Sequence, residues 1–482
     1  MSYGKHMKII MQPKFETTYG NLPDILYRAA NAVPVVAPYF VLANGKLAEQ
    51  IGVSSAWLQS DEALNALSGN APLPNARSIA MAYAGHQFGH FVPSLGDGRA
   101  VLIGEVMGSN SVRYDLHLKG AGRTPYSRGG DGRATLGAML REYIVSEAMA
   151  AYGIPTTRAL AVVATGELVP RERMEQGAVL TRVARSHVRV GTFQYLAARG
   201  DDDALRALVD YEMARNFVGA PMGPERFVWF LSQVVARQAV LIAQWMSVGF
   251  IHGVMNTDNM SVCGETIDYG PCAFMDAFNP QKVFSSIDQN GRYAWDKQPV
   301  MALWNLTRLA EAMLTLFDAD REKAIALAEA ELQKFMPAFE TAFESGMARK
   351  LGLQNCDGEF IAITLQALAD GRADFTNFFS ALSNGADVTS FFVSPTACGE
   401  WLTEWRAHGI IDVALMRATN PIFTPRNHRI EQAIVAANAG DLQPLHRLLK
   451  VLAQPFEQRP DDADLSLPPN VEEEVTQTFC GT

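Results

Sequence analysis

Apolar and polar residues alternate in one segment of the first half of the chain in the way that a strand of a half-buried sheet requires. In RYDLHLKG, residues 113–120, apolar side chains occupy every second position and polar ones stand between them. Lys119 ends this strand on its polar face. The apolar run within the segment 94–104, and the stretches 160–163 and 178–183, supply partner strands. These segments predict a small antiparallel sheet.

Beyond Asp201 the apolar residues recur with the spacing of helices. Residues 227–248 are apolar almost all round, which predicts a helix that is buried on every side. An earlier helix should begin at Thr135 and end at Gly153-Ile154-Pro155. Further helices are predicted for residues 298–316, 322–349, 359–383 and 428–452. A small antiparallel sheet followed by a mostly helical region is an α+β fold with two lobes.

The chain divides into five segments on this pattern. Residues 1–6, MSYGKH before Met7, are interpreted as a cloning leader, and residues 7–80 as an N-terminal wrap. Residues 81–190 form the sheet-bearing lobe, and residues 191–453 the helical lobe. Residues 454–482 combine several prolines with an acidic run, which predicts a mobile C-terminal tail.

Composition narrows the class of protein. The chain has 482 residues, of which 48% are hydrophobic and 19% charged, with a net charge of −10. This acidic balance argues against general nucleic-acid binding. No apolar run reaches the length of a membrane-spanning helix and no secretory signal is visible. The five cysteines are unevenly spaced, so we expect no disulfide framework and a reducing, cytoplasmic location.

Positive charge is concentrated in one region of this acidic chain. Residues 113–189 contain 12 Lys and Arg against 7 Asp and Glu, a net charge of +5. The loop 120–137 within this region holds six glycines and three arginines. Glycine lets backbone N–H groups approach an anion closely, and arginine adds cations. A confined basic region with such a loop predicts a site for a small polyanion such as a nucleotide.

Several residues in this region have ordinary alternatives. The glycine-rich segment with Gly96, Gly98 and Arg99 resembles a phosphate-binding turn, but any hairpin could contain it. Lys119 at the end of its strand could be a solvated lysine. Glu142 lies off the apolar stripe of its helix and could be a surface glutamate. Each of these signals is weak when taken alone.

The stretch HGVMNTDNMSVCGETIDYG, residues 252–270, is the strongest candidate for chemistry. It places Asp258 and Asn259 before a short predicted hairpin and Asp268 after it. A hairpin would bring Asn259 and Asp268 together, and two oxygen ligands beside phosphates suit Mg²⁺. The alternative is a hairpin whose ends are merely polar.

The order of these features along the chain matches the functional parts of a protein kinase. A glycine-rich turn, a strand lysine, a helix glutamate, an Asp-Asn pair and an Asp-Tyr-Gly triplet follow one another. One part is missing, because Val254 stands where kinases carry the aspartate that accepts the proton of the incoming hydroxyl. Asp258 is the nearest carboxylate that could replace it.

Three long runs strengthen this comparison. They are YAGHQFGHFVPSLGDGRAVLIGE, LHLKGAGRTPYSRGGDGRATLGAMLREY and HGVMNTDNMSVCGETIDYGPCAFMD. They closely resemble the selenoprotein O family, the bacterial YdiU-type protein adenylyltransferases, and the resemblance extends over nearly the whole chain. It implies a protein-kinase-like bilobal fold that binds ATP in reversed orientation. It also implies transfer of AMP to Ser, Thr or Tyr hydroxyls of proteins.

The resemblance assigns roles to individual residues. It implies that the nucleotide is contacted by Gly96, Gly98, Arg99, Lys119, Asp131, Gly132, Arg182, Arg189 and Asp268. Lys119 would also form an ion pair with Glu142. Asp258 would accept the proton of the acceptor hydroxyl, while Asn259 and Asp268 would hold Mg²⁺ or Mn²⁺.

The resemblance also suggests partners and regulation. Cys480 takes the place of the selenocysteine of vertebrate members, and a Cys272–Cys480 disulfide could fix the tail until thioredoxin- or glutaredoxin-type reductants release it. The expected partners are ATP and protein substrates, with no nucleic acid, no membrane and a monomeric state. Uridylyl transfer from UTP with Mn²⁺, phosphoryl transfer, and a non-catalytic nucleotide-binding pseudokinase remain alternatives.

Overall fold

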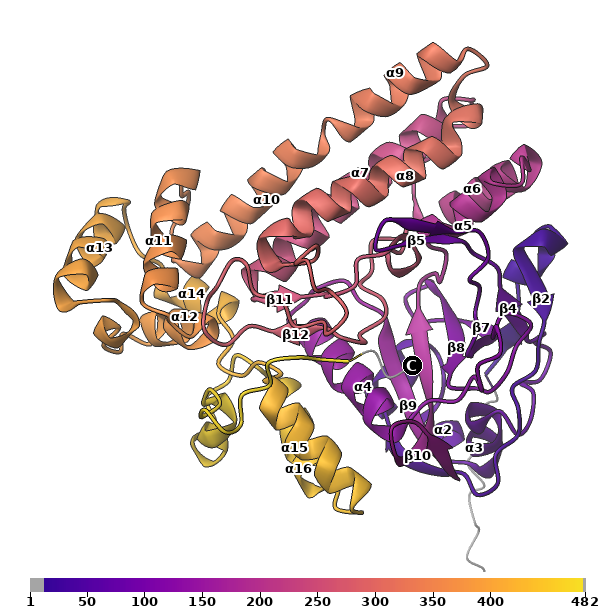
Figure 1. Ribbon diagram of the computed structural model, residues 1–482, viewed down its shortest axis with the longest axis horizontal. Helices are drawn as coiled ribbons and strands as arrows, with labels where there is room; N and C mark the ends of the chain where they lie inside the picture. The colour runs from indigo at the N-terminus through magenta and orange to yellow at the C-terminus, as the bar shows by residue number, and fades with distance from the viewer. Residues whose placement is uncertain (1–12, 480–482) are drawn as a thin grey trace, which may run out of the picture. The chain divides into compact units, whose positions relative to one another are not determined.

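The computed structural model describes residues 13–479, so the predicted leader, residues 1–6, and Cys480 lie outside the described residues. The chain forms two compact units. The sheet unit contains the described residues up to Tyr83, followed by Ser94–Met139 and Thr157–His187. The helical unit contains Ala84–Pro93, Leu140–Thr156 and the described residues from Val188 onward. The predicted α+β class, with an antiparallel sheet first and helices later, is confirmed and is consistent with a kinase-like fold (Figure 1).

An eight-stranded antiparallel sheet forms the centre of the sheet unit. Its strand order is β2-β4-β7-β8-β10-β9-β3, and β1 pairs with β7. The strands are β1 (Phe15–Glu16), β2 (Tyr27–Ala29), β3 (Tyr39–Ala43), β4 (Ile79–Met81), β7 (Ala100–Met107), β8 (Arg113–Lys119), β9 (Arg158–Pro170) and β10 (Met174–Ala184). The segment interpreted from sequence as a wrap, residues 7–80, therefore contributes strands β1 to β4 to the sheet.

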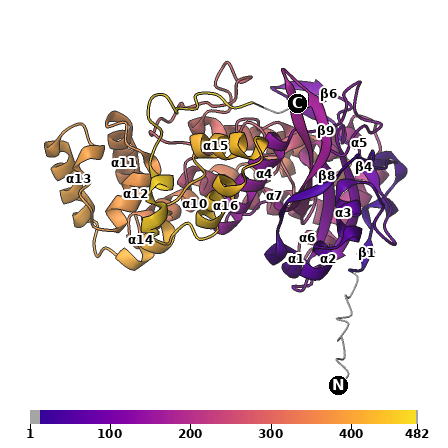
Figure 2. The ribbon, with the colours of Figure 1, turned by 90° about the horizontal axis from the view of Figure 1, so that it is seen from below.

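Three short helices cover one face of this sheet. They are α1 (Gly45–Gln50), α2 (Ser55–Leu58) and α3 (Asp61–Ser68), and each starts at a side chain that accepts a backbone N–H: Asn44, Ser54 and Ser60. Trp57 of α2 is buried in the same apolar cluster as Leu116 and Leu118 of β8. Figure 2 shows these helices together beside the strands. The apolar face of β8 is thus the face covered by helices.

The helical unit is built around two long helices, α7 (Arg226–Ser247) and α8 (Gln298–Phe317). By length and composition α7 could cross a membrane, but most of its apolar residues pack into the core of this unit. The prediction that it is buried on every side is wrong, because Val240 on its outer face is 45% exposed. Against them pack α5 (Val190–Ala197) and α6 (Asp202–Asn216). The unit also contains most of α4 (Leu136–Ala151), which starts next to Thr135 as predicted.

Three of the predicted helices are each broken into two. The pairs are α9 (Arg321–Leu332) with α10 (Phe335–Lys350), α11 (Gly358–Asp370) with α12 (Phe375–Ser383), and α15 (Asn427–Asn438) with α16 (Gln443–Leu452). Pro337 cannot continue a helix through residue 333, because its ring clashes with that carbonyl. Asp374 caps a new helix by accepting from Asn377 N–H. Gly440 adopts a φ of 91° just after α15, which ends that helix.

Arg426 joins three distant parts of the helical unit. Its guanidinium is fully buried and forms ion pairs with Asp276, next to β12 (Ala273–Phe274), and with Asp374 at a distance of 2.8 Å. Its Nε also donates to the Ser466 carbonyl oxygen at 2.9 Å. The segment after the Asp-Tyr-Gly triplet, the start of α12 and the C-terminal region are therefore held by one side chain.

The described part of the predicted C-terminal tail makes further contacts within this unit. Thr478 forms a parallel bridge with Ser285, and its N–H donates to the Phe284 carbonyl oxygen at 2.7 Å. Its hydroxyl donates to the Pro271 carbonyl oxygen. The prolines and acidic residues that predicted mobility thus lie in a segment whose last described residues pair with the chain that follows Asp268.

Candidate active site

The stretch 252–270 forms a loop between two paired strands of the helical unit. The strands β11 (Phe250–Ile251) and β12 (Ala273–Phe274) are antiparallel, which brings the two ends of the loop together. The predicted hairpin at residues 260–267 is wrong. Gly264 forms the expected turn, but Ser261 bridges to Arg189 and Thr266 to Thr156 instead of pairing with each other. The two flanking segments are too short to form strands and find partners elsewhere.

His252 connects the two halves of this loop. Its Nε2–H donates to the Ile267 carbonyl oxygen at 2.9 Å, and its Nδ1 accepts from Val254 N–H at 3.4 Å. Burial lowers the pKa of this imidazole, which keeps it in the neutral form that the two bonds require. The residue before Asp268 is therefore tied to the loop that contains Asp258.

Asp258 lies in a 3₁₀ turn, Thr257–Asn259, and is almost completely buried. Burial raises the pKa of its carboxyl to about 6, although the nearby Arg189 guanidinium acts in the opposite direction. Among the described residues its Oδ1 has no hydrogen-bond partner. A buried carboxylate with an unsatisfied oxygen and a pKa near neutrality is suited to accept a proton.

Asn259 and Asp268 present oxygen atoms in different ways. The Asn259 Nδ2–H donates to the Val254 carbonyl oxygen at 3.1 Å, which fixes the amide with Oδ1 on its other side. Asp268 has a φ of 68°, in the left-handed region that few residues other than glycine adopt. Strained backbone of this kind is typical of functional positions.

These two oxygen donors fit a hard cation that also binds phosphate. In the part of the chain that the structure describes, no cluster of three or more His, Cys, Asp and Glu side chains could hold a metal by protein ligands alone. Mg²⁺ usually binds to one or two protein oxygens and completes its shell with phosphates and water. Asp258, which precedes Asn259, provides a further oxygen atom, Oδ1, that accepts no hydrogen bond among the described residues.

A short hairpin contacts the loop that contains Asp258. The strands β5 (Gly85–Gln87) and β6 (His90–Val92) pair antiparallel, and the His86 N–H donates to Thr257 Oγ1 at 2.7 Å. Gln87 contributes a side-chain hydrogen bond that helps to lower the pKa of Asp258. Sequence reasoning missed Gln87, since nothing in the sequence indicates which loop this hairpin contacts.

The glycine-rich segment of the sheet unit is tightly packed. Gly96 has a φ of 62°, and a Cβ there would lie 2.3 Å from the Tyr126 ring. The Gly98 carbonyl oxygen accepts a bond from Ser127 Oγ, and the Arg99 carbonyl oxygen accepts one from Gly120 N–H at 2.8 Å. The two predicted nucleotide loops therefore contact each other.

Asp131 and Gly132 stabilise the second of these loops. Asp131 forms an ion pair with Arg171 at 2.7 Å and accepts from Arg133 N–H at 2.9 Å. The Arg171 guanidinium is the main cause of the lowered pKa of Asp131. A Cβ on Gly132 would lie 2.1 Å from the Gly122 carbonyl oxygen, so only glycine fits. The sequence did not reveal the role of Arg171.

Lys119 and Arg182 lie on the same face of the sheet. His117 is paired with Arg182 across β8 and β10, and Lys119 is two residues further along β8. Lys119 is only 5% exposed, so the alternative of a solvated lysine is wrong. Glu142 of α4 is 2% exposed and is not a surface glutamate either. Lys119 belongs to the sheet unit and Glu142 to the helical unit, and their ion pair stays a prediction.

The face of β8 that contains Lys119 holds more polar residues than the sequence analysis used. Asp115 and His117 are buried beside Lys119, and both contact other polar groups. The strict alternation in RYDLHLKG was the available signal. The alternation predicted that the polar face of this strand is exposed to solvent, whereas both of its faces are buried.

Arg189 and Cys272 belong to the helical unit. Arg189 is the N-cap residue of α5 and is 5% exposed. Its positive charge lowers the pKa of the Asp258 carboxyl. Cys272 is a buried free thiol, and its carbonyl oxygen accepts from Arg141 Nη1 at 3.2 Å. Burial raises the pKa of this thiol to about 12.

The pKa of Asp258 predicts the pH dependence of activity. Below pH 6 the carboxyl becomes protonated and cannot accept a proton, so kcat/KM should fall about tenfold for each pH unit. Because the folded pKa lies above its usual value, the ionised carboxylate destabilises the fold at neutral pH. Asp258→Asn should therefore lose activity while its melting temperature rises. Full activity at pH 5, or a lower melting temperature of this variant at pH 8, would contradict the assignment.

The chain is similar to known proteins over nearly its whole length. The family described as protein adenylyltransferase SelO matches residues 9–453. Proteins named protein nucleotidyltransferase YdiU from Rhodopseudomonas palustris (strain BisB5) and Bradyrhizobium sp. (strain ORS 278) are each 52% identical, over 97% of this chain and 99% of their own. A protein of the same name from Nitrobacter hamburgensis is 50% identical, over 97% of this chain and 96% of its own. The chain belongs to the SelO family and is an enzyme of the nucleotidyltransferase class.

Proposed function

We propose that the protein transfers AMP from ATP to Ser, Thr or Tyr hydroxyls of other proteins and releases pyrophosphate. Asp258 supports this proposal most strongly. It is a buried carboxylate with an unsatisfied oxygen and a pKa of about 6, and it lies four residues after Val254, where a kinase would carry its base. Because this carboxylate stands at a different position of the loop from the base of a kinase, it suits a hydroxyl that attacks the α-phosphorus instead of the γ-phosphorus.

The proposed step is a single displacement at the α-phosphorus. The hydroxyl oxygen forms a bond to this phosphorus while its proton moves to Asp258, and the bond between the α-phosphorus and the bridging oxygen to the β-phosphorus breaks. Pyrophosphate leaves with that electron pair. Arg182 and Lys119, on one face of the sheet, supply the positive charge that the β- and γ-phosphates need.

A divalent cation, Mg²⁺ or Mn²⁺, would neutralise charge on the phosphates when bound. Asn259 Oδ1 and the Asp268 carboxylate are the protein oxygens that would hold it. The reversed orientation of ATP follows from the same argument. If β- and γ-phosphates lie among Arg182, Arg189 and Lys119, the α-phosphorus is the one left towards the acceptor.

The position of a radiolabel tests this proposal directly. Label at the α-phosphate of ATP should appear on protein, and label at the γ-phosphate should leave as pyrophosphate. The protein mass should rise by about 329 Da per site, because cleavage at the α-phosphorus transfers the AMP moiety. Retention of γ-label with a phosphate-sized gain would show phosphoryl transfer instead, and the same gain from UTP alone would show uridylyl transfer.

The remaining elements of the proposal concern location and control. We propose a cytoplasmic, monomeric enzyme whose Cys272 forms a disulfide with Cys480 that a thioredoxin- or glutaredoxin-type dithiol reduces. Thr478, two residues before Cys480, bonds to the carbonyl oxygen of Pro271, which precedes Cys272. The bond would form by thiol–disulfide exchange, in which an oxidised, disulfide-containing partner accepts the two electrons and leaves as a dithiol. The raised pKa of Cys272 makes its thiolate scarce while the thiol is buried, so Cys480 would be the sulfur that first attacks this partner.

A further inference from the structure

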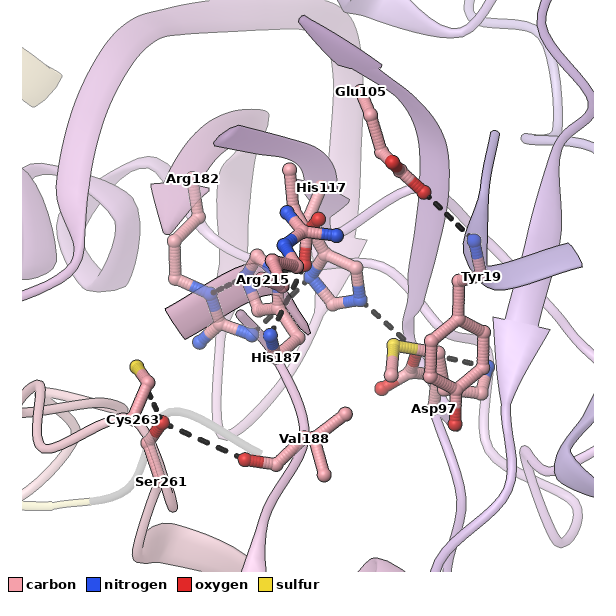
Figure 3. A network of polar contacts seen from close by, with 12 residues as sticks. Tyr19, Asp97, Glu105, His117, Arg182, His187, Val188, Arg215, Ser261 and Cys263 are labelled. Atoms are coloured by element: carbon pink, nitrogen blue, oxygen red, sulfur yellow. Dashed lines mark hydrogen bonds and ion pairs between the residues drawn. The ribbon is translucent and has the colours of Figure 1, made fainter. Parts of the chain in front are cut away.

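Five buried side chains of the sheet unit form one continuous series of polar contacts. The series runs from Asp97 through His117, Arg182 and His187 to Asp115. Its four bonds measure 2.9, 3.2, 3.3 and 2.9 Å in that order. Figure 3 shows Arg182 beside both histidines, with Asp97 at the far end of His117. None of the five side chains is more than 5% exposed.

The bonds fix the protonation of both imidazoles. Arginine can only donate, so His117 Nδ1 and His187 Nε2, which face Arg182, must be unprotonated acceptors. The other nitrogen of each ring faces a carboxylate and must carry the hydrogen. The two rings are therefore neutral and hold opposite tautomers: His117 is protonated at Nε2 and His187 at Nδ1.

Both carboxylates are themselves held by the backbone. Asp97 Oδ2 also accepts from Met81 N–H at 3.0 Å, and Asp115 Oδ2 accepts from His187 N–H at 3.0 Å. The two imidazole rings stack on each other with centroids 4.3 Å apart and an angle of 26° between their planes. The rings consequently have little freedom to rotate or to exchange tautomers.

The two histidines contact a particular edge of the guanidinium. Their acceptors bind Nε and Nη2 of Arg182, which form its side edge. Two hydrogen bonds to one edge fix the plane and the rotation of the guanidinium, so the two histidines set the direction in which the group points.

We infer that His117 and His187 are positioning residues that hold Arg182 through two opposite, fixed tautomers and so aim its guanidinium at the terminal phosphates of the nucleotide. This inference rests on the proposed function for the role of Arg182. The histidines touch neither nucleotide nor acceptor. They act through the arginine, and Asp97 and Asp115 act through the histidines.

Opposite tautomers predict opposite responses to the same pair of substitutions. An asparagine amide reaches the place of a histidine Nδ1, whereas a glutamine amide reaches the place of Nε2. At position 117, His117→Asn keeps an acceptor for Arg182 and His117→Gln keeps only a donor for Asp97. At position 187 the order is reversed: His187→Gln keeps the acceptor and His187→Asn keeps only the donor for Asp115.

The test measures binding of Mg·ATP and of AMP to the full-length protein and the four variants by calorimetry. At each position the variant without the acceptor should bind Mg·ATP about 10- to 100-fold more weakly than its counterpart, the loss typical of a hydrogen bond to a charged group. AMP lacks the terminal phosphates, so its affinity should differ little within each pair. The two members of a pair disturb the buried site to a similar extent and control for each other.

A merely structural role would weaken both members of a pair equally, or weaken AMP and ATP together, and either result overturns the inference. A second measurement needs no substitution in the protein studied. Nitrogen chemical shifts of ¹⁵N-histidine protein should show His117 as the Nε2–H and His187 as the Nδ1–H neutral tautomer. The chain has nine histidines, so assignment is tractable. An imidazolium, or the same tautomer at both positions, would also overturn it.

These measurements separate the inference from the proposed function. Binding of ATP and the tautomers are read without any transfer reaction. If the reversed pairs behave as expected but no AMP reaches protein, the proposed function fails and the positioning of Arg182 stands. If AMP is transferred and the pairs behave alike, the positioning fails and the proposed function stands.

Discussion

Replacement of Asp268 by asparagine is expected to lower AMP incorporation by at least about 10³-fold, because a metal clamp on the phosphates contributes several kcal/mol to the transition state. Asparagine is the informative substitution here. Asp268 has a φ of 68°, and asparagine tolerates this conformation whereas alanine would add backbone strain. The change therefore removes the charge and keeps a side chain of similar size that tolerates this backbone conformation.

The matched control is Asn259→Ala, which removes a neutral ligand from the same loop. A neutral amide holds Mg²⁺ less strongly than a carboxylate, so this variant should lose only about 10- to 100-fold. Incorporation of α-labelled AMP across a titration of Mg²⁺ measures both. Turnover of Asp268→Asn within threefold of the parent protein would remove this residue from the metal site.

Arg426→Ala is expected to destabilise the helical unit by about 3–5 kcal/mol, since it leaves two carboxylates without their buried cation. Asp276 and Asp374 would remain in place with their charges, and the Ser466 carbonyl oxygen would lose its donor. Denaturant unfolding followed by far-UV circular dichroism measures the change.

Arg447→Ala provides the control for this effect. Arg447 also pairs with two aspartates, Asp462 and Asp464, but its side chain is 40% exposed. Solvent screens such pairs, so its removal should cost only about 0–1 kcal/mol. Equal losses in the two variants would mean that burial of Arg426 does not decide its contribution.

The loop that contains the predicted catalytic carboxylate could be recognised in the sequence because its polar residues are consecutive. Asp258 and Asn259 are adjacent, and the structure places both in one 3₁₀ turn. The environment that sets the pKa of Asp258 was not predictable. Burial raises this pKa, whereas Arg189 and Gln87, 69 and 171 positions away from Asp258, lower it, and no local pattern encodes such contacts.

The helix boundaries of the helical region were also only partly predictable from local sequence pattern. Apolar spacing predicted where helices lie, but it could not show that residues 322–349 contain two helices, because the stripe continues across the break. Pro337 was visible in the sequence and explains the interruption at residue 333. A proline within a continuous apolar stripe therefore predicts that the helix is interrupted before it.

The contacts between the two glycine-rich loops have a consequence for how nucleotide is bound and released. Ser127 and Thr124 donate to the carbonyl oxygens of Gly98 and Asp97, so the first loop is already ordered by the second. Ordering a free loop would cost about 1–2 kcal/mol per residue in backbone entropy. That cost is met when the chain folds, and affinity for nucleotide is not reduced by it. The rate of nucleotide dissociation should then depend on the strength of the phosphate contacts rather than on the opening of a mobile loop.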